Sequence, residues 1–156
     1  MTPGINALKK AGVAFRVHEY EHDPDSQSYG LEAAQKMNVE PARVFKTLVV
    51  LVDGKSMAVG IVPVKAQLSL KQIAKATSGK KATMADPKAV ERSTGYILGG
   101  VSPLGQKRPL KTFIDQSAES FETIFVSAGR RGLEIELSPQ DLGALLNAAF
   151  VPLQQE

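Results

Sequence analysis

A lysine near the start of an apolar run is the first residue in this sequence that could do chemistry. Lys46 and Thr47 lead into the run from Leu48 to Val52, and this pattern is typical of a strand buried on one or both faces. Because an ammonium group is costly to remove from water, a lysine in such a strand needs an explanation. Lys46 either marks the exposed start of the strand or points into a pocket and binds an anionic ligand. The rest of the chain favours the pocket.

A glycine-rich segment is the second candidate. Gly99 and Gly100 follow a short apolar run, Tyr96 to Leu98, which predicts a strand. Backbone at adjacent glycines can approach a ligand closely, and its N–H groups can donate to a developing negative charge. An ordinary turn would have the same composition. No Gly-Lys-Ser or Gly-Lys-Thr follows, so the segment is not a Walker A loop.

Metal and thiol chemistry are disfavoured. The chain has no cysteine, which excludes a disulfide framework, a thiolate metal site and a cysteine nucleophile. His18 and His22 are four residues apart among acidic residues, but the alternation from Phe15 to Tyr20 predicts a strand. No spacing typical of a metal site supports these histidines. We therefore expect neither a metal nor another cofactor.

The charge balance indicates only mild affinity for polyanions. Nineteen basic and sixteen acidic residues give a net charge of +3, below what dedicated nucleic-acid binders usually carry. Four basic clusters are either solvated surface or sites of modest phosphate contact. They are Lys9-Lys10, Lys80-Lys81, Gln106-Lys107-Arg108 and Arg130-Arg131.

Length and hydropathy favour one domain over residues 1–156 and a cytoplasmic protein. The chain is long enough for a sizeable core, and 43% of its residues are hydrophobic. The start, Met1 to Gly4, leads into an amphipathic segment rather than a signal peptide. No apolar stretch approaches the length that crosses a bilayer, so we expect no membrane partner. Nothing in the sequence requires more than a monomer.

Turn and capping signals divide the chain into alternating short elements. Asp53-Gly54 predicts an antiparallel hairpin between its flanking apolar runs. The period-2 pattern from Leu133 to Leu137 predicts leucine and isoleucine side chains inside and Glu134 outside. Residues after Pro152 are expected to be frayed. Helices are predicted over Pro3–Ala11, Tyr29–Asn38, Leu70–Ala76, Pro87–Ser93 and from Pro139; further strands are predicted over 13–20, 81–84, 110–115 and 121–127. This order favours an α+β fold with a mixed sheet closing toward a barrel.

Three ordered motifs carry a resemblance to a known family. Phe45-Lys46-Thr47-Leu48, the segment from Ser93 to Gly105, and the segment from Phe121 to Gly129 resemble the YbaK/EbsC family. These proteins are free-standing relatives of the editing domain of bacterial prolyl-tRNA synthetases. The resemblance covers essentially the whole chain, and the match extends furthest with the branch that deacylates Cys-tRNA(Pro).

The resemblance implies both a fold and a set of site residues. The fold would be a mixed six-stranded pseudo-barrel with peripheral helices. The family's lysine corresponds to Lys46, which is expected to orient the ester, and the N–H groups of Gly99 and Gly100 are expected to bind the carbonyl oxygen. The remaining expected substrate-binding residues are Tyr20, Tyr29, Thr47, Ser127 and Glu134. Relatives commonly have phenylalanine at position 29, so Tyr29 adds a hydroxyl group.

The implied reaction is trans-editing, in which cysteine is removed from tRNA(Pro). In the family, the thiol of the substrate is thought to attack its own ester, while the protein supplies shape and charge. Prolyl-tRNA synthetase is the expected partner, because a lightly charged protein should hold tRNA loosely alone. Two alternatives stay open: an Ala-tRNA or Ser/Thr-tRNA deacylase of the same fold, and a module that binds tRNA ends or nucleotides without turnover.

Overall fold

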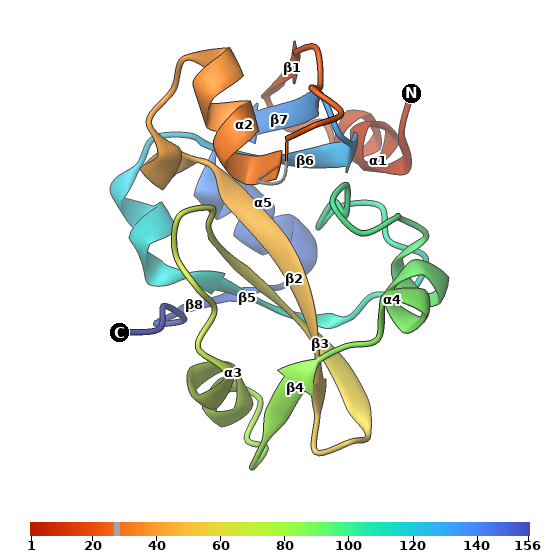
Figure 1. Cartoon of the computed structure of the whole chain (residues 1–156), viewed down its shortest axis with the longest axis vertical. Coiled ribbons are helices and arrows are strands. Elements are labelled where there is room, and N and C mark those ends of the chain that lie inside the picture. Colours follow the sequence, from red (N-terminus) through yellow and green to blue (C-terminus); the bar gives the residue numbers. More distant parts are fainter. Residues whose placement is uncertain (27–28) are drawn as a thin grey trace.

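Two β-sheets organise the chain, whose computed structural model describes residues 1–26 and 29–156 (Figure 1). The smaller sheet is antiparallel with the order β1-β7-β6, and its strands are β1 (Phe15–Glu19), β6 (Ile124–Arg130) and β7 (Leu133–Leu137). The larger sheet has the order β4-β2-β3-β5-β8. Its strands are β2 (Phe45–Val52), β3 (Ser56–Pro63), β4 (Ala82–Met84), β5 (Lys111–Asp115) and β8 (Ala149–Val151).

The larger sheet is mixed, as predicted. The Asp53-Gly54 turn joins β2 and β3 as an antiparallel hairpin, with Phe45 opposite Pro63 and Val52 opposite Ser56. β3 pairs in parallel with β5, and β5 pairs in parallel with β8. Both faces of β2 are covered, because Val49 and Val50 are buried in different apolar clusters. Coverage of both faces explains why β2 reads as a continuous apolar run.

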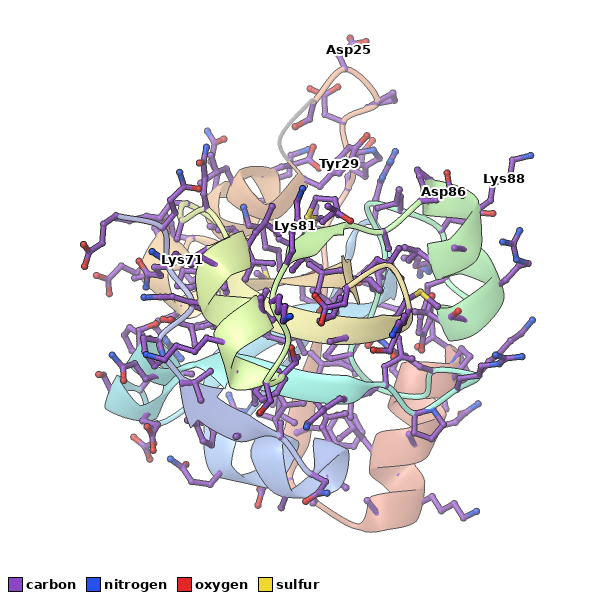
Figure 2. The ribbon with its side chains drawn as sticks, turned by 90° about the horizontal axis from the view of Figure 1, so that it is seen from below. Asp25, Tyr29, Lys71, Lys81, Asp86 and Lys88 are labelled. Carbon is purple, nitrogen blue, oxygen red and sulfur yellow. The ribbon has the colours of Figure 1, made fainter. Side chains whose placement is uncertain are left out.

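Short helices begin where the sequence places capping residues. The helices are α1 (Pro3–Ala11), α2 (Tyr29–Met37), α3 (Leu70–Ala76), α4 (Pro87–Thr94) and α5 (Pro139–Leu146), with 3₁₀ turns at Pro41–Arg43 and Gln116–Ser120. Thr2, Ser69 and Ser138 each accept a backbone N–H of the following helix, and Asp86 does the same for α4 (Figure 2). None of these helices is long and apolar enough to span a membrane.

The α+β class is confirmed, but the expected six strands closing toward a pseudo-barrel are not what the structure shows. Residues 1–26 and 29–156 form eight strands in two sheets that do not close on each other. The sheets meet at a parallel bridge between Val44, just before β2, and Phe125 of β6. Further along β2, β4 occupies the edge opposite β3 at Val50–Val52, so β6 cannot continue along it. Figure 1 shows β2 descending from the small sheet into the large one.

The predicted strand over Tyr96–Leu98 is also wrong. This segment belongs to an irregular loop after α4. The Tyr96 side chain is buried, and its hydroxyl donates to the carbonyl of Leu104 at 2.6 Å. Tyr96 therefore fixes the loop to the core in place of strand pairing, and of the two glycines that follow, Gly99 is exposed and Gly100 is buried.

The C-terminal segment is ordered against the core, contrary to the expected fraying. Leu153 is fully buried, and its N–H donates to Asp115 Oδ1 at 2.9 Å. Gln154 Nε2 donates to the other carboxylate oxygen at 2.9 Å, and Ser117 N donates to it at 3.2 Å. Burial alone would raise the pKa of Asp115, but these hydrogen bonds outweigh burial and hold the pKa below its usual value.

We expect Asp115→Ala to lower the free energy of unfolding by about 2–4 kcal/mol, because the donors of Leu153 and Gln154 would lose a charged acceptor. Urea unfolding at neutral pH measures this change. Glu119→Ala is the control, since it removes an exposed carboxylate from the neighbouring 3₁₀ turn. Equal stability of the two variants would show that Asp115 does not anchor the C-terminal segment.

Candidate functional site

A cavity of about 470 Å³ lies where the start of β2 meets the small sheet. It brings together side chains from the end of β1, the start of α2, β2, β6, β7 and the glycine loop. Every expected site residue except Gly100 lines it: Tyr20, Tyr29, Lys46, Thr47, Gly99, Ser127 and Glu134. Residues far apart in the sequence thus converge on one concave site.

Lys46 is a half-buried cation in this cavity. It is the second residue of β2 and pairs with Val62 of β3. Burial lowers the pKa of its ammonium group. No carboxylate of the described chain lies within 4.0 Å of it, whereas five other basic side chains make such pairs. Lys46 can therefore attract an incoming anion or a developing oxyanion.

Glu134 is the buried carboxyl group of the cavity, and the prediction that it points to solvent is wrong. Only 7% of the residue is exposed, although Leu133 and Ile135 on either side are buried as well. Leu133 and Ile135 face the apolar core on one side of β7, and Glu134 faces the cavity on the other side, where the lining residues cover it. Burial raises the pKa of Glu134 to about 8, so the group is largely neutral at pH 7.

Tyr20 and Glu134 share the inner end of the cavity. Tyr20 follows β1, and its N–H donates to the carbonyl of Gly132 at 2.9 Å. Burial raises the pKa of the Tyr20 phenol to about 12, and the nearby carboxyl of Glu134 adds to this shift. The phenol therefore remains protonated and can donate a hydrogen bond to a ligand.

The hydroxyl groups of Thr47 and Ser127 have no histidine beside them in the described part of the cavity lining. Within the described residues the Thr47 Oγ1 atom is buried without a hydrogen-bond partner. Ser127 lies opposite Glu134 in the β6–β7 pairing, and its Oγ accepts the N–H of Gly129 at 3.1 Å. No histidine is among the described residues that line the cavity, and neither hydroxyl forms a hydrogen bond with Glu134 or Lys46 there, so the histidine-activated form of nucleophilic catalysis is not assembled.

The histidines are engaged elsewhere. His18 Nε2 lies 2.8 Å from Glu136 Oε1, and His22 Nδ1 lies 2.6 Å from Glu32 Oε1. Glu136 also accepts from the Thr123 hydroxyl at 2.6 Å. Within the part of the chain that the structure describes, no three His, Asp or Glu side chains gather as metal ligands would.

Three segments meet at the mouth of the cavity. The Arg131 guanidinium lies 3.6 Å from the centroid of the Tyr29 ring, and its Nη2 is 3.5 Å from the carbonyl oxygen of Leu98. Gly99 has a φ of +91°, and a Cβ there would lie 2.7 Å from Arg131 and 2.8 Å from Tyr29. Only glycine allows the loop to approach this pair so closely. Figure 2 shows Tyr29 near the protruding loop that carries Asp25.

Gly100 was expected to direct its N–H into the site, toward the substrate carbonyl oxygen, but the structure places it elsewhere. Its N–H donates to the carbonyl of Ile97 at 2.9 Å, and the residue does not line the cavity. In this structure the Gly100 N–H is part of a turn and is not available to an oxyanion.

Sequence reasoning did not single out Arg131, which lines the cavity beside Tyr29. In the sequence, Arg131 is noted only as a member of the basic cluster Arg130-Arg131. The two residues differ in the structure, since Arg130 is paired with Glu19 at 3.8 Å. Sequence reasoning did not single out Gly30 either. A Cβ at this position would lie 2.3 Å from Val64, so a glycine is needed for α2 to pack closely here and to place Tyr29 in the cavity.

Comparisons with known proteins agree with one another. Residues 24–145 match the profile of the aminoacyl-tRNA editing domain. The chain is 34% identical over 152 residues to EbsC of Enterococcus faecalis, which is named provisionally as a Cys-tRNA(Pro)/Cys-tRNA(Cys) deacylase; the match covers 97% of this chain and 92% of EbsC. It is 32% identical to the uncharacterised YwhH of Bacillus subtilis, over 71% of this chain and 70% of YwhH.

A solved structure has the same architecture. It is described provisionally as a trans-editing enzyme for prolyl tRNA synthetase, and it superposes with a TM-score of 0.86 at 26% identity. The superposition covers 99% of this chain and 96% of that one. The two-sheet arrangement is therefore shared along essentially the full length.

Proposed function

Because the chain belongs to the YbaK/EbsC family of aminoacyl-tRNA editing domains, we propose that it is a trans-editing deacylase that removes cysteine wrongly attached to tRNA(Pro). The observation that carries this proposal is a cavity holding a cation and a carboxyl group that are not paired with each other. Lys46 and Glu134 both line it, and no ion pair joins them in the described residues. An aminoacyl ester has a partner for each of them: its electron-rich ester group for Lys46 and its α-ammonium group for Glu134.

Lys46 and Glu134 orient the substrate from its two ends. Lys46 contacts the ribose of the terminal adenosine and favours negative charge on the ester carbonyl. Glu134 receives the α-ammonium group of the amino acid, which favours ionisation of the carboxyl group once the substrate is bound. Tyr20, Thr47 and Ser127 surround the amino-acid side chain, and the N–H of Gly99 is directed to the carbonyl oxygen.

The substrate supplies the nucleophile. The cysteine sulfur attacks its own ester carbon, so that a sulfur–carbon bond forms as the carbon–oxygen bond to the ribose breaks. The thiol proton passes to the leaving ribose oxygen, which becomes a hydroxyl group, and a cyclic thiolactone is released. This route is supported by the lack of a cysteine in the chain and of a histidine among the described cavity residues, since neither a cysteine nor a histidine-activated hydroxyl is then present to attack the ester.

Selection of tRNA(Pro) depends on prolyl-tRNA synthetase in this proposal. A net charge of +3 supports only weak binding to an RNA backbone. The synthetase would bind the tRNA body while this protein receives the 3′ end. Discrimination between tRNA(Pro) and other tRNAs is therefore expected to be lost in assays without the synthetase.

Single-turnover deacylation of three esters of the same tRNA tests the substrate assignment. Cys-tRNA(Pro) is expected to lose its amino acid rapidly, and Ala-tRNA(Pro) and Ser-tRNA(Pro) to stay near the uncatalysed rate, because neither has a thiol. Equal rates on alanine would exclude an obligatory thiol and indicate another branch of the fold. Binding of uncharged tRNA with no turnover of any ester would indicate a binding module.

A further inference from the structure

We infer that Arg131 is a positioning residue that binds the phosphate group of the 3′-terminal nucleotide at the mouth of the cavity. This inference rests on the proposed function, because it concerns how an aminoacyl-tRNA enters the same site. Three observations support it: the position of Arg131, the directions left open around its guanidinium, and the charge of the cavity behind it.

Arg131 lies at the mouth of the cavity. Arg131 lies in the β6–β7 turn, it lines the cavity, and it is exposed to solvent, whereas Lys46 and Glu134 lie deeper. An ester that enters with its amino acid toward Glu134 leaves the ribose near Lys46. The 5′-phosphate of that nucleotide, and the rest of the RNA, then extend outward past the mouth. Arg131, exposed at the outer side of the cavity lining, lies along this path.

The guanidinium is held in place without being neutralised. One of its faces lies 3.6 Å from the Tyr29 ring centroid, a cation–π contact that orients the planar group. Among the described residues its acceptor is the Leu98 carbonyl at 3.5 Å, which is a long contact. Across the described chain no carboxylate lies within 4.0 Å of it, so most of its N–H donors can form a two-pronged contact with a phosphate.

The loop opposite Arg131 is shaped around it. At Gly99 a Cβ would lie 2.7 Å from Nη2 and 2.9 Å from Nε of Arg131. Any side chain at position 99 would displace the guanidinium. A loss of activity in Gly99→Ala would therefore have two sources, the moved arginine and the altered backbone N–H, so Gly99 alone cannot test this inference.

The experiment compares substrates with and without the phosphate. We would measure kcat/KM on Cys-tRNA(Pro), on 2′(3′)-O-cysteinyl adenosine 5′-monophosphate and on 2′(3′)-O-cysteinyl adenosine. Arg131→Ala is expected to lower kcat/KM about 10- to 100-fold on the two phosphate-bearing esters, the range expected for a charge-assisted hydrogen bond. The adenosine ester should react at the wild-type rate, because it has no phosphate to lose.

Two further variants separate charge from structure. Arg130→Ala removes a neighbouring charge that is paired with Glu19 outside the cavity, and it should leave all three rates unchanged. Arg131→Lys keeps the charge but loses the planar group over Tyr29, so it should recover part of the loss. An equal loss on the adenosine ester, or no loss on any ester, would overturn the role of Arg131.

Failure of the proposed function is distinguishable, since wild-type protein would then release cysteine from none of the esters. In that case binding still tests Arg131. The affinity for a short uncharged single-stranded RNA ending in CCA is measured against salt concentration. One lost phosphate contact should reduce the slope of log K against log salt by about 0.7 in Arg131→Ala. An unchanged slope would refute the contact.

Discussion

Replacing Lys46 with alanine is expected to lower the single-turnover rate on Cys-tRNA(Pro) about 100- to 1,000-fold, the range found when one stabilising group is removed from a developing oxyanion. Lys46 is a half-buried cation in the cavity with no ion-pair partner in the described chain, so its charge is not neutralised and can act on the ester. The fold should be unaffected, because removing a desolvated ammonium group relieves an unfavourable burial.

Lys55→Ala is the matched control for Lys46→Ala. Lys55 lies in the exposed turn at the other end of the same β2–β3 hairpin, so its replacement changes the net charge equally without touching the cavity. Lys46→Arg should retain some binding but lose rate, because the guanidinium has a different length and geometry. Deacylation at the wild-type rate by Lys46→Ala would remove Lys46 from the mechanism.

Replacing Glu134 with glutamine is expected to stabilise the protein at alkaline pH and to slow the reaction. In the unfolded chain the carboxyl group ionises near its ordinary pKa of 4.5, whereas in the folded chain it keeps its proton up to a pKa of about 8. Wild-type stability therefore falls as the pH rises through this window and levels off above it. The total loss is on the order of a few kcal/mol, at about 1.4 kcal/mol per pKa unit.

Glutamine carries no ionisable proton, so Glu134→Gln should show no such fall in stability. Urea unfolding at about pH 5 and about pH 9 measures it: the two proteins should differ little at the lower pH, and the variant should be the more stable at the higher. Glu136→Gln, two residues along β7, should instead lower the free energy of unfolding at the higher pH. Glu136 accepts from His18 and Thr123, and the loss of its charge weakens both contacts.

The same Glu134→Gln change should lower the rate on Cys-tRNA(Pro) about 10- to 100-fold, because a neutral amide attracts an ammonium group less than a carboxylate does. Gain of stability together with loss of rate is typical of a group kept for function rather than folding. A variant that is both stabilised and fully active would contradict the role given to Glu134 in binding the α-ammonium group.

Local signals in the sequence were sufficient for most elements. Capping side chains at Thr2, Ser69, Asp86 and Ser138 begin four helices where the pattern predicted them, because each bonds to backbone only two or three residues away. The Asp53-Gly54 turn set the β2–β3 register for the same reason. Such interactions are complete within a few residues and do not depend on the rest of the fold.

Predictions failed where a distant segment supplies the partner. Glu134 was expected outside because its strand alternates, yet its side chain lies in a cavity lined by segments distant in the sequence. Residues after Pro152 were expected to fray, yet Asp115 on a neighbouring strand accepts their hydrogen bonds. In neither case does a residue nearby in the sequence indicate the partner.

The sequence by itself determined the α+β class, the hairpin that carries Lys46, the absence of cysteine chemistry and the resemblance to editing domains. Tertiary structure alone decided that two open sheets, not a closed barrel, meet at Val44 and Phe125. It also decided that Arg131 lies over Tyr29 and that the Gly100 N–H is used within a turn. The physical reason is that residue type and spacing set local bonding, whereas burial and charge pairing depend on which distant strands and loops pack together.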